Sequence, residues 1–146
     1  MDSPLLAALA ALPHGPEFRF LDSLLHLEPG KSGTGEYKVR EDEPFLRGHF
    51  PGQPLMPGVL LIEAAAQLAG TVAQSDPQIK PLRDLKLAAL RSVKIFGTAR
   101  PGEVIEIEAQ ITGRLSGLVQ AQAKAWVSDQ LVLEAELTLA GEPQSA

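Results

Sequence analysis

The chain has 146 residues, of which 45% are hydrophobic and 21% are charged, a length and composition that suit one globular domain (residues 1–146) with one core. Its net charge of −5 at pH 7 argues against a general nucleic-acid-binding protein, which would usually carry a basic surface. The chain contains no cysteine, which excludes disulfide bonds, thiol nucleophiles and cysteine-bound zinc, and His14, His26 and His49 lack the spacing of a metal-binding pair, so no metal site is expected.

The N-terminal residues, Met1 to Leu12, predict a short helix. Ser3 suits the cap of a helix and Pro4 suits its first turn. The segment is apolar enough to suggest a secretory signal peptide, but it carries Asp2 and no positive charge. No apolar run in the chain is long enough to cross a membrane, so we expect a cytoplasmic protein.

Two strands are predicted between this helix and the central part of the chain. The run from Glu17 to Leu27 is rich in Phe and Leu and ends at Glu28-Pro29-Gly30, which favours a turn. The run from Gly33 to Arg40, in which Tyr37 and Val39 alternate with polar residues, predicts the second strand.

The central stretch combines a stiff loop with a long apolar helix. Three prolines and three glycines lie between Gly48 and Gly58, so little of this backbone is free to rotate. Pro57 suits the first helical position, and almost every residue from Val59 to Val72 is apolar or small, which is typical of a buried helix. Glu63 and Gln67 interrupt this pattern, and because they are four residues apart they share one face.

Four further strands are predicted after the helix. The run from Leu85 to Ile95 alternates loosely, whereas three later runs alternate clearly and predict an antiparallel meander: Glu103 to Thr112, Val119 to Val127 and Leu131 to Leu139. Residues 141–146 are expected to form a loose tail. The order of two strands, a helix, a strand and a meander indicates an α+β protein whose curved sheet wraps around the helix.

Glu63 is the residue in this helix that most needs an explanation. A glutamate in a buried helix is costly unless it is paired or protonated, and His49 on the preceding loop is the candidate partner. A His and a Glu in an apolar pocket can serve as an acid/base pair. For either residue alone a structural role is the simpler hypothesis, but the two together favour a functional site.

The stretch from Gly48 through Gln67 resembles, without a gap, the signature of the (3R)-hydroxyacyl-[acyl carrier protein] dehydratases of fatty acid synthesis, the FabA/FabZ type. A weaker similarity extends over Leu12 to Ala140, with a departure at Gly15, where the family usually has a basic residue. The resemblance implies the hotdog fold and the dehydration of carrier-bound 3-hydroxyacyl thioesters to trans-2-enoyl thioesters, without a cofactor beyond the phosphopantetheine of the carrier. It also implies a homodimer, or a trimer of such dimers, with each active site at the dimer interface.

The resemblance assigns roles that fit the chemistry of the residues. His49 suits a base that removes the C2 proton, because its ordinary pKa lies near neutrality, and Glu63 suits the acid that protonates the leaving hydroxyl or the holder of the water that leaves. Gly58 and Val59 at the helix N-terminus offer backbone N–H groups to the thioester oxygen. Two neighbouring residues are candidates for support: Gln67 and Phe50.

The window from Lys80 to Arg100 holds six basic residues against one acid, Asp84. Acyl carrier protein is acidic and carries a phosphate, so a basic patch here would steer it. The candidates for carrier binding are Arg83, Lys86, Arg91, Lys94 and Arg100. Ordinary solvated strand faces explain the charges equally well, and Phe96-Gly97-Thr98 stands where the family commonly has a basic run ending in proline.

Three other functions stay open at this point. The first is an acyl thioesterase on the same fold, which would use a carboxylate or an activated water at the carbonyl. The second is a non-catalytic protein that binds acyl chains or the carrier. The third is an isomerising dehydratase, although relatives of that kind usually have Asp at the position of Glu63.

Overall fold

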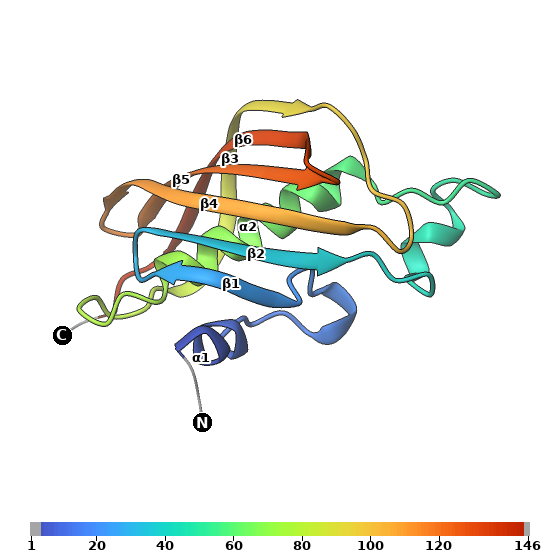
Figure 1. Cartoon of the computed structure of the whole chain (residues 1–146). Helices are drawn as coiled ribbons and strands as arrows, with labels where there is room; N and C mark the ends of the chain where they lie inside the picture. Colours follow the sequence, from blue (N-terminus) through green and yellow to red (C-terminus); the bar gives the residue numbers. More distant parts are fainter. Residues whose placement is uncertain (1–3, 145–146) are drawn as a thin grey trace.

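The structure is a computed structural model that describes residues 4–144, and it consists of one curved antiparallel sheet around one long helix (Figure 1). Its elements in chain order are α1 (Pro4–Ala10), β1 (Ser23–Glu28), β2 (Ser32–Lys38), α2 (Gly58–Ala73), β3 (Arg83–Ile95), β4 (Val104–Leu115), β5 (Leu118–Val127) and β6 (Gln130–Glu142). Two short 3-10 turns complete the list, Pro16–Phe18 and Pro44–Arg47. None of the helices in residues 4–144 is long and apolar enough to span a membrane.

The six strands form a single sheet in the order β1-β2-β4-β5-β6-β3. Every neighbouring pair is antiparallel, so β4, β5 and β6 form the predicted meander and β1 and β3 are the two edges. The α+β arrangement expected from the order of elements, a sheet wrapped around a helix, is confirmed.

Helix α2 is buried against the inner face of this sheet, where it contacts β2, β4, β5 and β6. Leu61, Leu68 and Val72 are almost completely inaccessible to solvent. Many of the contacting residues are small and buried, namely Ala64, Ala65 and Ala69 on the helix and Ala121, Ala123 and Ala125 on β5. Small side chains on both surfaces let the helix lie close to the sheet, so the position of its polar face is fixed by packing.

The first predicted strand is partly wrong. Strand β1 begins only at Ser23, because Pro16 starts a 3-10 turn and the chain that follows is attached to α2 rather than to another strand. The Phe20 N–H donates to the side chain of Gln67 at 2.8 Å, which replaces the strand hydrogen bond that the apolar pattern suggested.

The start of helix α2 and the start of the C-terminal tail also differ from the predictions. Helix α2 begins at Gly58, one residue later than predicted, with Pro57 as its N-cap. The predicted loose tail starts too early, because β6 continues to Glu142, whose carboxylate lies 3.4 Å from the guanidinium of Arg83. The predicted helix cap at Ser3 lies outside the described residues.

Candidate active site

His49 is held in one orientation by the loop that carries it. Its Nδ1 lies 3.0 Å from the carbonyl oxygen of Leu55, and its ring stacks on Phe50 with the centroids 4.0 Å apart. A carbonyl oxygen can only accept a hydrogen bond, so Nδ1 carries the proton and donates it. The neutral ring therefore leaves Nε2 unprotonated, which is the form of histidine that can remove a proton.

The loop around His49 is closed by backbone hydrogen bonds. Phe50 and Gln53 exchange two of them, at 3.0 and 2.8 Å, and the N–H of Met56 donates to the carbonyl of Ala99 at 2.8 Å. Met56 is also fully buried. The loop is thus anchored at its base to the connection between β3 and β4, which fixes where His49 can be presented.

Glu63 lies in the middle of α2. Both polar contacts of its carboxylate are made by the same oxygen, Oε2. The Gln67 Nε2 donates to Glu63 Oε2 at 3.1 Å, as the spacing of four residues predicts for a shared helix face. The His14 Nε2 lies 3.3 Å from the same Oε2. Within residues 4–144, no hydrogen bond to Glu63 Oε1 is found.

Gln67 is the anchor of this arrangement. Its Oε1 accepts from the Phe20 N–H at 2.8 Å, and its Nε2 donates to the Phe18 carbonyl at 2.9 Å as well as to Glu63. Because a backbone N–H can only donate, these contacts settle which end of the amide is oxygen. Gln67 is 2% exposed, so it connects the chain before β1 to α2 and orients Glu63 from a dry position.

The structure does not bring His49 and Glu63 together within one chain. No hydrogen bond or ion pair joins them in residues 4–144, and the residues that compensate Glu63 are Gln67 and His14. The expectation that His49 is the residue that compensates Glu63 is therefore not met among residues 4–144 of one chain.

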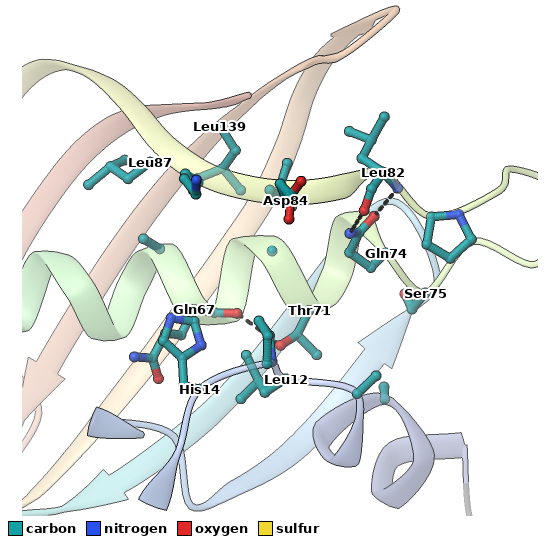
Figure 2. Close-up of a pocket in the computed structure, with 18 of the residues that line it drawn as sticks. Leu12, His14, Gln67, Thr71, Gln74, Ser75, Leu82, Asp84, Leu87 and Leu139 are labelled. Carbon is teal, nitrogen blue, oxygen red and sulfur yellow. Dashed lines mark hydrogen bonds between the residues drawn. The ribbon is translucent and has the colours of Figure 1, made fainter. Parts of the chain in front are cut away.

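A cavity of about 800 Å³ lies beside Glu63, between α2, the N-terminal segment and β3 (Figure 2). From α2 and its C-cap residue it is lined by residues that share one stripe of the helix: Glu63, Ala66, Gln67, Gly70, Thr71 and Gln74. Leu87 of β3 and Leu139 of β6 face this stripe in Figure 2, and Leu85 of β3 also lines the cavity. The cavity thus follows the helix from the carboxylate toward the end of α2, with polar side chains along the helix and apolar side chains of β3 and β6 opposite them.

The N-terminus of α2 has the geometry expected for binding an oxyanion. The N–H groups in the first turn of a helix have no intrahelical partner, and here these belong to Gly58 and Val59. Val59 is 68% exposed, so this end of the helix is open. A Cβ on Gly58 would lie 3.0 Å from the Cδ1 of Ile95, so glycine also allows β3 to approach the helix closely.

The basic residues of the predicted carrier-binding patch lie on and after β3, and several face an acid. Arg83 forms an ion pair with Glu142, Arg91 lies opposite Glu136, and Lys94 lies opposite Glu134. Two members of the patch differ from these: Lys86 lines the cavity, and Arg100 is exposed after the strand. The opposing glutamates reduce the net positive charge of the strand face, which leaves Lys86 and Arg100 as its stronger candidates.

His14 is the site residue that sequence reasoning missed. No role in the site was assigned to it from the sequence, yet it lies at the cavity with its side chain 28% exposed and directed at Glu63. His14 is 49 residues away from Glu63 in sequence, so no spacing rule connects them. The signal that could have found it is the Leu12-Pro13-His14 segment, which belongs to the weaker part of the family resemblance.

Replacing Gln67 by Leu is expected to lower the free energy of unfolding by about 3 kcal/mol, because it leaves the Phe20 N–H and the Phe18 carbonyl without their partner. Urea unfolding at a fixed protein concentration, followed by the fluorescence of the single Trp126, measures this. The matched control is Gln120→Leu on the exposed face of β5, which should change stability little. Equal losses in the two variants would contradict the anchoring role of Gln67.

Known proteins are similar to this chain in sequence and in fold. The chain matches the model of the FabA-like domain over residues 12–136. It is 39% identical to the 3-hydroxyacyl-[acyl-carrier-protein] dehydratase FabZ of Chloroflexus aggregans, over 90% of this chain and 91% of that protein. It is 37% identical to the FabZ of Syntrophotalea carbinolica, over 99% of both chains. Among solved structures, the dehydratase heterocomplex ApeI:P from Xenorhabdus doucetiae superposes with a TM-score of 0.80 at 16% identity, covering 98% of this chain and 94% of that one, a similarity of fold.

Proposed function

The chain belongs to the FabA-like family and dehydrates 3-hydroxyacyl thioesters on acyl carrier protein, and we propose that His49 is the base and Glu63 the acid of this reaction. The product is a trans-2-enoyl thioester of the kind used in fatty acid biosynthesis. Two observations support these roles. His49 Nδ1 is bonded to the Leu55 carbonyl, which leaves Nε2 open to accept a proton, and both contacts of the Glu63 carboxyl group are made by Oε2, which leaves Oε1 open toward a substrate.

His49 begins the reaction by taking the proton from C2 of the substrate. Its Nδ1–H stays on the Leu55 carbonyl, so the proton is received at Nε2 and the resulting cation is stabilised by that hydrogen bond. Negative charge then grows on the thioester oxygen. The N–H groups of Gly58 and Val59 and the positive end of the helix dipole stabilise it.

Glu63 completes the reaction by protonating the hydroxyl that leaves C3. In the neutral acid, Oε2 is the carbonyl-like oxygen that accepts from Gln67 and His14, and Oε1 carries the proton toward the substrate. The C3–O bond breaks and the electron pair from the C2–H bond forms the double bond. The hydroxyl group leaves C3 as water, and transfer of the proton from His49 Nε2 through solvent to the Glu63 carboxylate restores both residues.

The active site is proposed to form between two chains, with His49 of one protomer and Glu63 of the other. Edge strand β3 offers a surface for this, because its outer edge has no neighbouring strand among residues 4–144 and it exposes Leu90 (43%) and Ile95 (44%). Phe96, just after the strand, is 57% exposed. Pairing of two β3 edges would cover these side chains and would hold the N-termini of both α2 helices near the interface.

The substrate is proposed to enter with its acyl chain in the cavity along α2 and its phosphopantetheine arm directed toward the outside. No cofactor takes part in these proton transfers, since the phosphopantetheine belongs to the substrate. Lys86 lines the cavity and Arg100 lies after β3, so these two cations are proposed to bind the phosphate or the acidic surface of the carrier.

Changing Lys86 to Glu is expected to raise KM for the carrier-bound substrate about tenfold and to leave kcat nearly unchanged, because the interaction is electrostatic and precedes the chemistry. The effect should shrink at high salt and should be absent with a pantetheine thioester that lacks the carrier. Lys38→Glu on β2 introduces the same charge change away from β3 and serves as the control. If both variants raise KM alike, the effect is one of net charge and the assignment of Lys86 fails.

The experiment that tests the function is the absorbance of the enoyl thioester formed from 3-hydroxybutyryl thioester on acyl carrier protein, with longer 3-hydroxyacyl chains in parallel. Dehydration is expected for at least one chain length. Release of free thiol instead would identify a thioesterase, and binding of the acyl carrier without turnover at any chain length would identify a binding protein.

A further inference from the structure

His14 is partly buried beside the Glu63 carboxylate, unlike a histidine on the protein surface. It lies in the loop after α1, at the edge of the cavity (Figure 2). Its Nε2 is 3.3 Å from Glu63 Oε2. The side chains of both residues are largely covered, at 28% and 23% exposed. His26, by comparison, lies on β1 with its side chain exposed and has no such neighbour among residues 4–144.

The backbone around His14 is held from the following segment. The Arg19 Nη2 donates to the carbonyl oxygens of Leu12 and His14, at 3.1 and 3.4 Å. The Phe18 ring is stacked at 6.4 Å from the imidazole with an angle of 24° between the planes. Since Gln67 ties Phe18 to α2, the same anchor sets the position of both His14 and Glu63.

The hydrogen-bonding pattern indicates which nitrogen of His14 carries the proton. Its Nδ1 is buried and has no partner in the described chain, so a proton placed there would leave a donor buried and unpaired. A neutral ring with the proton on Nε2 avoids this cost and donates to Glu63 Oε2. His14 and Gln67 are then two N–H donors converging on one oxygen of one carboxyl group.

We infer that His14 is a positioning residue that, together with Gln67, holds Glu63 Oε2 so that Oε1 faces the substrate. This inference rests on the proposed role of Glu63 as the acid. One hydrogen bond, from Gln67, would leave the carboxyl group free to rotate about its last bond and to exchange its two oxygens. A second donor from the cavity side fixes the plane of the group and selects the oxygen that carries the proton.

The test compares His14→Leu, which fills the space without a donor, with His14→Gln, whose terminal amide N–H can take the place of Nε2–H. With the carrier-bound substrate, His14→Leu is expected to lower kcat about tenfold while KM changes less than about twofold, because the substrate still binds but the acid is misaligned. His14→Gln should recover most of kcat. His26→Leu is the matched control and should behave as the wild type.

The positioning role predicts one further result that a packing role would not give. In a Glu63→Gln background, which lacks the acid, adding His14→Leu should cause no further loss of kcat, because there is no proton left to orient. The inference is overturned if folded His14→Leu keeps its kcat, if it raises KM alone, or if His14→Gln is no better than His14→Leu. Absence of dehydration in the wild-type enzyme would instead refute the proposed function.

Discussion

Replacement of Glu63 by Gln is expected to lower kcat about a thousandfold, the loss that follows removal of a general acid. The amide has the shape of the carboxyl group, and its oxygen can accept from Gln67 Nε2 and His14 Nε2 as Oε2 does. Its NH2 group would then occupy the position of Oε1, where it can form a hydrogen bond to the leaving hydroxyl but cannot protonate it. Single-turnover dehydration of the carrier-bound substrate measures the chemical step directly.

The stability of Glu63→Gln and the activity of a second variant, Glu63→Asp, make this expectation specific. The thermal midpoint of Glu63→Gln should stay close to that of the wild type, because the hydrogen-bond network is retained. Glu63→Asp keeps an acid but withdraws it by one methylene from both donors, so it should keep more activity than Glu63→Gln and less than the wild type. If Glu63→Gln dehydrates the substrate as fast as the wild type does, Glu63 is not the acid, and the polar group at this position only completes the fold.

The helix and the meander were predictable because both depend on local patterns. The apolar run from Val59 to Val72 has the length and evenness of a buried helix, and the stiff loop before it ends at Pro57, so helix α2 was misplaced by only one residue. The last three strands alternate with period two, and the structure places their apolar sides on the inner face.

The chain before β1 was not predictable in the same way. Its apolar residues suggested a strand from Glu17, but Phe20 donates its N–H to Gln67 of α2 rather than to a neighbouring strand, and β1 begins only at Ser23. Buried irregular chain and buried strand have similar compositions, and the difference depends on a side chain that is 47 residues away in sequence. For the same reason the sequence offered His49 as the partner of Glu63, although tertiary structure gives that position to His14.

The edge position of β3 links the fold to the proposed dimer. The loose alternation of residues 85 to 95 did not show which strand would pair with it, and the structure places it at the edge beside β6 with large apolar residues exposed. An exposed apolar edge is unfavourable in an isolated chain. Its proposed pairing with a second copy explains in one step why the edge is apolar and why His49 and Glu63 are separate within each chain.

A heterodimer of one His49→Ala chain and one Glu63→Gln chain is expected to have about half of the wild-type activity per dimer. One of its two shared sites would contain an intact His49 and an intact Glu63. His49→Ala alone should lose activity about a thousandfold, as expected for removal of a general base, and Glu63→Gln should do likewise. When both are produced together with different affinity tags and purified through both, each dimer combines the intact His49 of one chain with the intact Glu63 of the other. Enoyl formation by this species, relative to the two homodimers, is the measurement.

The reciprocal heterodimer decides between a shared site and a site within one chain. If one chain carries both His49→Ala and Glu63→Gln and its partner is wild type, a shared site leaves each active site with one missing residue, so the dimer should be inactive. A site formed within one chain predicts the opposite result in both experiments, because the wild-type chain would keep a complete site and two singly substituted chains would not. Activity in the reciprocal heterodimer together with inactivity in the first would therefore refute the shared site and would require His49 and Glu63 to act within one protomer.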